Sequence, residues 1–158
     1  MTLPIRSCAA VAAVLLLTGW QAKKASQPAD CNVLTPADIK AVTGVEVQPL
    51  PRGGSPGAGG CANFKTADGH AYLGVNRYRG PGKYQTAVAS VPESVYPKRT
   101  PVTGLGDEAV LMKDDTGKLR YLVARKGETT VVLFPLSFTE PMSDEQLRKL
   151  AERALAAK

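Results

Sequence analysis

The sequence contains few of the residues that usually perform catalysis or hold a metal ion. Its 158 residues include one histidine, His70, one tryptophan and three cysteines. A zinc site needs about four ligands at regular spacings, and a catalytic histidine needs a partner that orients it. The sequence shows neither at a recognisable spacing, and His70 lies beside a glycine turn, where histidine usually faces solvent. We therefore expect no metal, no cofactor and no enzymatic activity.

Strong charge and long apolar runs are also missing. The formal net charge of +6 falls to about +3 without Arg6, Lys23 and Lys24 of the N-terminal segment. Such a small excess does not favour nucleic-acid binding. The apolar stretch 9–17 is shorter than the roughly 20 residues of a membrane-spanning helix. A hydrophobic content of 44% and a charged content of 22% are typical of a globular protein.

Residues 1–25 have the features of an export signal followed by a short linker. Arg6 gives a positive start, and residues 9–17 form an apolar middle. Leu16-Leu17-Thr18-Gly19 resembles the first part of a bacterial lipoprotein signal, but Trp20 stands where a lipid-carrying cysteine would follow. Inefficient cleavage, an uncleaved anchor and a lipoprotein-like chain without its attachment residue all remain open. Each predicts export to the periplasm or cell envelope, with membrane contact only through an uncleaved N-terminal segment.

Two of the three cysteines lie outside this signal and are expected to form a disulfide bond. Cys8 falls within the apolar part of the signal, which leaves Cys31 and Cys61. An even number of cysteines in an oxidising compartment predicts a disulfide rather than a metal site. Closing a loop of about 30 residues would stabilise the fold by roughly 3–4 kcal/mol. The bond would lie within a single globular domain, residues 26–158.

Residues 102–137 predict three antiparallel strands joined by two turns. The strand-like runs are 108–113, 119–126 and 129–137, and glycine-containing turns separate them. Apolar residues recur at every second position in each run: Val110, Met112, Leu119, Tyr121, Val123, Val132, Phe134 and Leu136. A period of two predicts one buried face and one solvent-exposed face.

Two helices carry clear start signals. Thr35 suits the N-cap of the first helix, Pro36 its first position, and Gly44 the residue that ends it. Ser143 and Gln146 have the spacing of a capping box at the start of the last helix. The apolar stripe of that last helix needs a sheet to pack against.

Weaker patterns complete the predicted fold. A short helix is expected at 83–90, short strands at 45–50, 61–65 and 70–79, and a proline-containing surface crossing at 92–101. The resulting order is α-β-β-β-α-β-β-β-α. It predicts an α+β domain, with an antiparallel sheet of about six strands and the helices packed on one face.

Several short motifs resemble a known family. They are Cys31-x-x-Leu34-Thr35 opening a helix, Thr43-Gly44 ending it, Cys61, and Gly104-Leu105-Gly106-Asp107-Glu108-Ala109 before a strand. Together with the closing helix, over roughly residues 31–156, they look like bacterial envelope lipoproteins of the Cys-Leu-Thr and Gly-Leu-Gly-Asp-Glu-Ala type. This resemblance implies a small α+β domain without an assigned activity and without catalytic residues.

The stretch from Gly104 to Glu108 is the most suggestive candidate for a site. Gly104 and Gly106 directly precede a strand, which indicates unusual backbone torsions or close packing. Asp107 or Glu108 can accept hydrogen bonds from such a turn or pair with a cation. One interpretation is a strand-entry turn held by a carboxylate, and the other is a ligand-contact loop.

A binding face is suggested by aromatic and cationic side chains near the two hairpins. These are Tyr72, Arg77, Tyr78, Arg79, Arg120 and Tyr121, with Tyr84 close by in sequence. If they share an uncovered sheet face, they suit an anionic glycan, an anionic lipid headgroup or an acidic protein. The alternative is a set of ordinary cross-strand pairs on a wet face.

These observations favour an exported envelope domain that binds another envelope protein, a glycan or a lipid headgroup, and that has no enzymatic activity. The alternatives are a small periplasmic hydrolase and a hydrolase inhibitor that presents the 31–61 loop. A purely structural accessory subunit is a third possibility that sequence cannot separate from the first.

Overall fold

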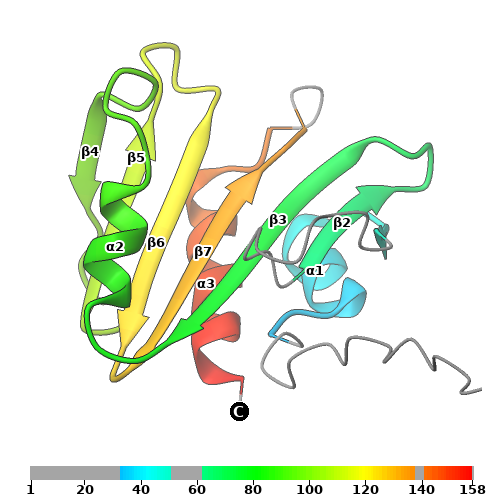
Figure 1. Cartoon of the computed structure of the whole chain (residues 1–158). Coiled ribbons are helices and arrows are strands. Elements are labelled where there is room, and N and C mark those ends of the chain that lie inside the picture. Colours follow the sequence, from blue (N-terminus) through cyan, green and yellow to red (C-terminus); the bar gives the residue numbers. More distant parts are fainter. Residues whose placement is uncertain (1–32, 51–61, 138–140, 158) are drawn as a thin grey trace, which may run out of the picture.

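The computed structural model describes residues 33–50, 62–137 and 141–157. They form a seven-stranded sheet in which every neighbouring pair of strands is antiparallel, in the spatial order β1-β2-β3-β7-β6-β5-β4 (Figure 1). The strands are β1 (Val47–Pro49), β2 (Ala62–Thr66), β3 (Ala71–Arg79), β4 (Lys98–Pro101), β5 (Glu108–Lys113), β6 (Arg120–Lys126) and β7 (Thr129–Pro135). The helices are α1 (Pro36–Thr43), α2 (Lys83–Ala89) and α3 (Asp144–Ala156). The predicted α+β class and antiparallel sheet are confirmed.

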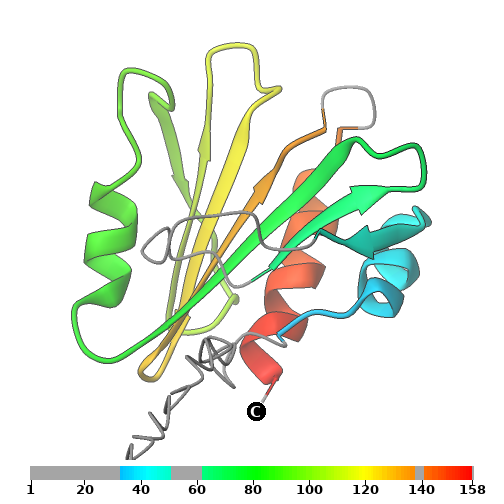
Figure 2. The ribbon, with the colours of Figure 1, turned by 45° about the vertical axis from the view of Figure 1, so that its right-hand side comes forward.

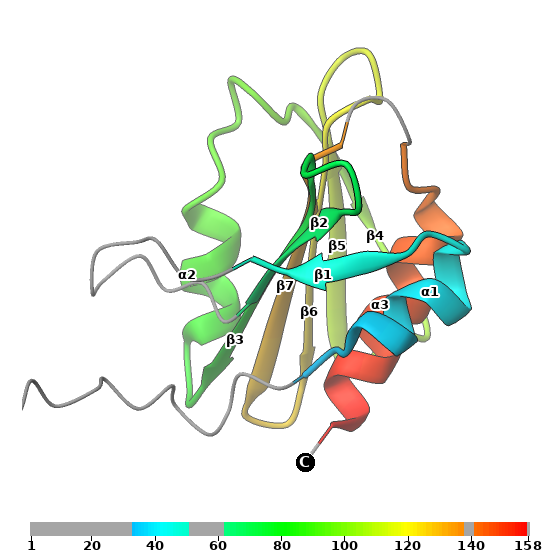
Figure 3. The same ribbon diagram turned by 90° about the vertical axis from the view of Figure 1, so that its right-hand side faces the viewer.

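The helices lie on both faces of the sheet. α1 and α3 pack against each other and cover one face, hereafter the α1/α3 face, whereas α2 packs on β6 and β7 from the other side, the α2 face (Figure 3). The expectation that all helices share one face therefore holds only for α1 and α3. No local sequence signal shows on which face of the sheet α2 packs, because a helix that follows β3 can reach either face.

One strand was not expected from the sequence. β4 lies within the segment predicted to be a surface crossing, and it pairs with β5 from Lys98 opposite Lys113 to Pro101 opposite Val110. It is an edge strand, and so is β1 at the other end of the sheet. Both edges carry proline, and β4 also carries lysine and arginine. These residues are typical of edges that resist pairing with another chain. In β4 they also replace the alternating apolar pattern from which a strand is predicted.

The predicted start and end of α1 and the predicted start of α3 are confirmed. Thr35 and Asp38 form a reciprocal capping box, with the backbone N–H of Asp38 donating to Thr35 Oγ1 at 3.2 Å. Ser143 and Gln146 form the second capping box at the start of α3. Gly44 ends α1 with a φ of 78°, which side chains other than glycine rarely adopt. α1 therefore begins and ends where local sequence signals place it, and α3 begins where its capping box predicts.

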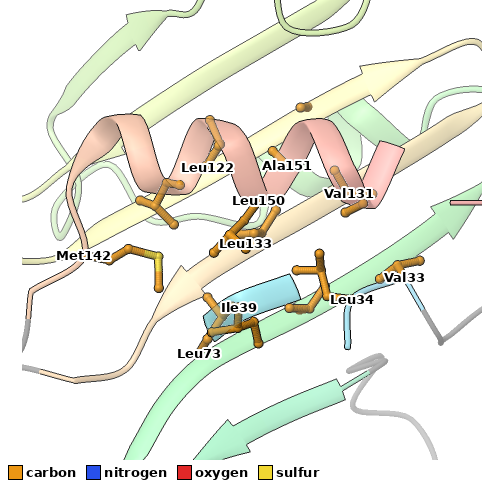
Figure 4. Close-up of a cluster of buried hydrophobic side chains, with 14 of the residues drawn as sticks. Val33, Leu34, Ile39, Leu73, Leu122, Val131, Leu133, Met142, Leu150 and Ala151 are labelled. Carbon is orange, nitrogen blue, oxygen red and sulfur yellow. The ribbon is translucent and has the colours of Figure 1, made fainter. Parts of the chain in front are cut away.

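The main core lies between the sheet and the helix pair. Figure 4 shows Ile39 of α1 and Leu150 of α3 meeting Leu73 of β3 and Leu133 of β7. All four side chains are fully buried. Burying a leucine or isoleucine in this way contributes roughly 1.5–3 kcal/mol each, so this layer supplies most of the apolar stabilisation.

A second, smaller core lies under α2. Met112, Val123 and Val132 are buried there with Ala87 and Val91 from α2 and the residues that follow it. The apolar positions that sequence periodicity selected in β5–β7 point to this face, while the intervening residues point to the main core. The expectation of a solvent-exposed face is therefore wrong for these three strands, since consecutive residues of β7 are buried on alternate faces.

Candidate functional site

The glycine-rich turn between β4 and β5 packs tightly against the β6–β7 hairpin. Gly106 has a φ of 63°, and a Cβ at this position would lie less than 3.0 Å from the carbonyl oxygen of Arg125. The backbone N–H of Asp107 donates to that same carbonyl oxygen at 2.7 Å. Leu105, between the two glycines, is buried in the main core. The turn thus needs glycine for close approach, as the sequence indicated.

The two carboxylates after this turn hold the neighbouring hairpin. Asp107 Oδ2 accepts from the backbone N–H of Gly127 at 2.7 Å and from Arg125 Nη1 at 3.3 Å. Glu108 Oε2 accepts from Arg125 Nε at 3.2 Å, and Arg125 Nη1 also donates to Gly127 O at 2.8 Å. Gly104, Gly106, Asp107 and Glu108 therefore lie in a strand-entry turn held by carboxylates, which is the first of the two interpretations of this stretch.

The residues predicted to form a binding face are divided between the two faces. Tyr72 is only 2% exposed and belongs to the main core. The register slips here, because Phe64 pairs with Leu73 and Lys65 with Ala71, which leaves Tyr72 as the extra residue of a β-bulge. A bulge turns a side chain to the other face, and a strict period of two cannot anticipate it.

Two arginines of the predicted binding face, Arg77 and Arg120, instead contact the two ends of α3. Arg77 is buried and donates from Nη2 to the carbonyl oxygen of Ala157, directly after the last turn of α3, at 2.9 Å. Arg120 Nε donates to Asp144 Oδ1 at the start of α3 at 2.9 Å, and Lys113 contacts the other oxygen of Asp144. Burial raises the pKa of Asp144, but the hydrogen bonds from Lys113 and Arg120 outweigh it and leave the pKa below its usual value. Arg77 and Arg120 thus attach the helix to β3 and β6.

Tyr78 and Tyr121 lie together on the α2 face with other aromatic side chains. The ring centroids of Tyr121 and Phe134 are 5.6 Å apart with an interplanar angle of 13°, so the rings stack. Tyr96, after α2, meets Tyr121 edge-on with centroids 5.9 Å apart. We call Phe134, Tyr121 and Tyr96 the aromatic row. All three are partly buried against the second core, so each ring keeps some contact with solvent.

The aromatic row is anchored on a glycine. Phe134 pairs with Gly74 in the register of β7 and β3, and its ring extends over Gly74. A Cβ at residue 74 would lie less than 3.0 Å from three atoms of the ring. Glycine in the interior of a strand often marks such a close approach. No sequence pattern marks Phe134 or Tyr96 as a site residue, and the glycine in the interior of β3 is the signal that points to this contact.

Neutral polar groups border the aromatic row. Asn76 Nδ2 and the hydroxyl of Tyr78 are hydrogen-bonded at 3.3 Å, and Asn76 Oδ1 is buried without a donor among the residues the structure describes. Asn63 pairs with Gly74 and is exposed. Burial raises the pKa of Tyr121, and the nearby Tyr78 and Tyr96 raise it further. The hydroxyl of Tyr121 therefore stays protonated at neutral pH.

The α2 face is only partly covered by its helix. α2 packs on β6 and β7, and β3 and β2 extend beyond it (Figure 2). The strip formed by Asn63, Gly74, Asn76 and Phe134 lies along this border. Among the described residues, shallow hollows of about 300 to 580 Å³ lie around α1, the β2–β3 turn, and the two ends of α3. Their rims carry oppositely charged pairs such as Lys40 with Glu46.

His70 and Arg79 lie at opposite ends of β3. His70 lies exposed in the β2–β3 turn, with Nε2 3.7 Å from Asp68 Oδ2. Within the described ranges, no three residues of the histidine, cysteine, aspartate or glutamate type gather as metal ligands. The helices in those ranges are also too short or too polar to cross a membrane. Arg79 is exposed at the end of β3.

Cys31 and Cys61 both lie outside the described residues, so the disulfide stays a prediction. The 31–61 loop of the inhibitor hypothesis lies partly outside them as well. Comparison of the chain with protein-family models, with curated proteins and with solved structures finds no match. Any function must therefore be argued from the residues themselves.

Proposed function

We propose that this chain is an exported, non-catalytic binding domain of the bacterial cell envelope, and that the aromatic row makes the contact. The observation that carries the proposal is the fixed position of Phe134, between the backbone of Gly74 on one side and the ring of Tyr121 on the other. An aromatic ring held in this way loses little conformational freedom on binding, which is what a contact residue requires.

The chemistry around the aromatic row supports binding rather than catalysis. Its neighbours are the amides of Asn63 and Asn76 and the hydroxyl of Tyr78. The amides do not titrate near neutral pH, and the raised pKa of Tyr121 removes that residue as a general base. Amides and hydroxyls instead fix the orientation of a ligand through hydrogen bonds.

Export to the envelope is supported by the N-terminal segment and by the two cysteines outside it. Arg6 followed by the apolar residues 9–17 has the composition of an export signal, and Cys31 with Cys61 suits an oxidising compartment. The partner we propose is accordingly another component of the periplasm or envelope: a glycan, a protein or a lipid headgroup.

Chemical crosslinking in a bacterial host tests the proposal with three versions of the full chain. Phe134→Leu removes the aromatic face but keeps an apolar side chain over Gly74. Tyr84→Leu is the matched control, because Tyr84 packs against the second core without belonging to the aromatic row. We expect the chain in the envelope fraction, with one crosslinked species that Phe134→Leu reduces about tenfold and Tyr84→Leu preserves.

Two results would contradict the proposal. The first is a chain that fractionates with the cytosol. The second is a crosslinked species that forms equally with all three versions, since the aromatic row would then play no part in the contact.

A further inference from the structure

We infer that the loop between α2 and β4 enters an apolar pocket of a partner protein, an inference that rests on the proposed function and specifies its partner. We call residues 90–97 the α2–β4 loop. It contains Tyr96, the member of the aromatic row that lies outside the sheet, and Val95 directly beside it. In Figure 2 and in Figure 3 the loop stands out from the sheet, at the end where β5 and β6 are joined.

The α2–β4 loop presents apolar side chains to solvent. Among the residues that the structure describes, Val95 is the large hydrophobic side chain that stays exposed, at 43%. Pro92 and Pro97 are exposed on either side of it, and Tyr96 is partly exposed. A single exposed valine is ordinary, but these four apolar side chains lie within residues 92–97. Apolar surface concentrated in this way is typical of a protein contact.

The backbone of the α2–β4 loop is held in one conformation by its own hydrogen bonds. The N–H groups of Val95 and Tyr96 both donate to the carbonyl oxygen of Pro92, at 3.2 and 3.0 Å. Pro92 and Pro97 also have φ angles that are fixed by their rings. The loop therefore loses little conformational freedom when a partner covers it, which favours affinity.

Contacts with the rest of the protein fix the position of the loop. Arg99 Nη2 donates to the carbonyl oxygen of Val91 at 2.7 Å, which joins the two ends of the loop. Lys98 Nζ donates to the carbonyl oxygen of Asp115 at 2.6 Å and so attaches the start of β4 to the β5–β6 turn. Tyr96 is held edge-on within the aromatic row. The side chains of the loop are thus displayed on a rigid base, as contact residues of a protein interface are.

The shape of the loop favours a protein over a small ligand. None of the hollows described above is lined by a residue of the loop, whereas sugars and other small ligands are bound mainly in concave sites. A partner that covers a protruding apolar loop has to supply the concave side itself, which a pocket of a folded protein does.

The charges near the loop do not suit an anionic lipid headgroup. Lys98 and Arg99 are the cations beside the loop, and both donate hydrogen bonds within the protein. The carboxylates of Glu93 and Asp115 offset them. Headgroup binding depends on a clear excess of positive charge, and this end of the sheet has none among the described residues.

Site-specific photocrosslinking of the full chain in a bacterial host tests the inference. A photoreactive phenylalanine analogue is introduced at position 95 in one version and at position 37 in the control, because Ala37 is exposed on α1, on the α1/α3 face. We expect one adduct of defined mass from position 95 and none of that mass from position 37. The mass should not change after lysozyme digestion of the cell-wall glycan or after lipid extraction, because the partner is a protein.

Competition by purified full-length chain shows whether the side chains of the loop make the contact. The original chain should suppress the position-95 adduct in a saturable manner. Val95→Asp should require at least about tenfold more chain, because it brings a charge into an apolar pocket. Ala37→Asp is the matched control and should compete like the original chain. Both positions are exposed, so neither substitution should lower the urea midpoint, which separates lost contact from lost folding.

A second variant tests the rigidity of the loop. Arg99→Gln keeps Val95 and Tyr96 in place but removes the hydrogen bond that joins the ends of the loop. We expect it to compete about threefold to fivefold less well than the original chain, because the loop then loses more freedom on binding.

Three results would overturn the inference. The first is the absence of a position-95 adduct. The second is an adduct whose mass changes with lysozyme or lipid extraction, which would indicate a glycan or a lipid headgroup. The third is equal competition by Val95→Asp and Ala37→Asp.

Failure of this inference and failure of the proposed function are distinguishable. Phe134 supports Tyr96 through the ring of Tyr121, so Phe134→Leu should also reduce the position-95 adduct. If position 95 gives no adduct but the crosslinked species of the full chain still depends on Phe134, only the assignment to the loop is wrong. If neither measurement depends on Phe134, the proposed function fails as well.

Discussion

Replacing Gly74 with alanine would push the Phe134 ring out of its place. The added Cβ would lie less than 3.0 Å from three ring atoms, whereas carbon atoms in contact prefer about 3.5–4.0 Å. The backbone of residue 74 is not in the left-handed region, so the side-chain clash is the cause of any loss. The ring must move by roughly 1 Å or more, and Tyr121 stacks against it.

The expected effect is a loss of about 2 kcal/mol in the free energy of unfolding. Overpacking of this kind costs about 1–3 kcal/mol, and losing an aromatic stack costs about 0.5–1.5 kcal/mol. In the opposite direction, alanine in a strand is favoured over glycine by about 0.5–1 kcal/mol, because the unfolded chain has less freedom to lose. The clash outweighs this gain.

Urea unfolding followed by circular dichroism measures the loss as a lower midpoint with an unchanged slope. The same substitution in a Phe134→Ala background is the control, because the ring that the Cβ would meet is then absent. There we expect Gly74→Ala to be neutral or slightly stabilising, which gives a coupling energy of about 2 kcal/mol between the two positions. An equal loss in both backgrounds, or none in the original chain, would refute the close fit of Phe134 on Gly74.

Three further substitutions test other parts of the structure. Gly106→Ala should lower the unfolding free energy by about 2–4 kcal/mol, because its φ is 63° and its Cβ would clash with a backbone carbonyl rather than a movable side chain; an unchanged urea midpoint would contradict this. Thr35→Ala should cost about 1 kcal/mol through the loss of the capping box, measured in the same way, while Thr35→Ser should cost less. Asp144→Asn should reduce the acid sensitivity of the fold. The pKa of Asp144 is lower in the folded state than its ordinary value of 3.8, so its contribution is present above pH 3.8 and is lost as the pH falls through the folded-state pKa. Urea midpoints at neutral and acidic pH should therefore differ less in this variant than in the original chain, and an equal difference would contradict the ion pairs.

Local signals were sufficient to predict the helices and most strands. Thr35, Gly44 and Ser143 mark helix ends through contacts with residues a few positions away, so the local sequence is enough to predict where these helices start or stop. The edge strand β4 was harder to predict, since it owes its strand to pairing with β5 rather than to its own composition. The position of α2 was not predictable from periodicity. In β5–β7 the residues of both faces are largely apolar. The alternation of apolar residues therefore does not show that each face is covered by a helix.

The candidate site was predictable only in part because it depends on strand register. Phe134 and Gly74 lie far apart in the sequence, and they meet because β3 and β7 pair in one particular alignment. The sequence identifies Tyr78 and Tyr121 as aromatic residues of hairpins, and the structure places both on the α2 face. Alternation groups Tyr72 with them, but the bulge in β3 moves it into the main core.

The arginines show why an exposed-looking cation in a sequence can be a structural residue. A helix leaves unpaired carbonyl groups at its C-terminus and a partial positive charge at its N-terminus. Arg77 supplies a donor to the C-terminal end of α3, and Arg120 holds Asp144 where the N-terminal end favours a carboxylate. α3 is thereby attached to β3 and β6 at both ends, and these two strands carry Asn76 and Tyr121 on the opposite face. The cations thus hold α3 against β3 and β6, whose opposite face carries residues of the proposed contact.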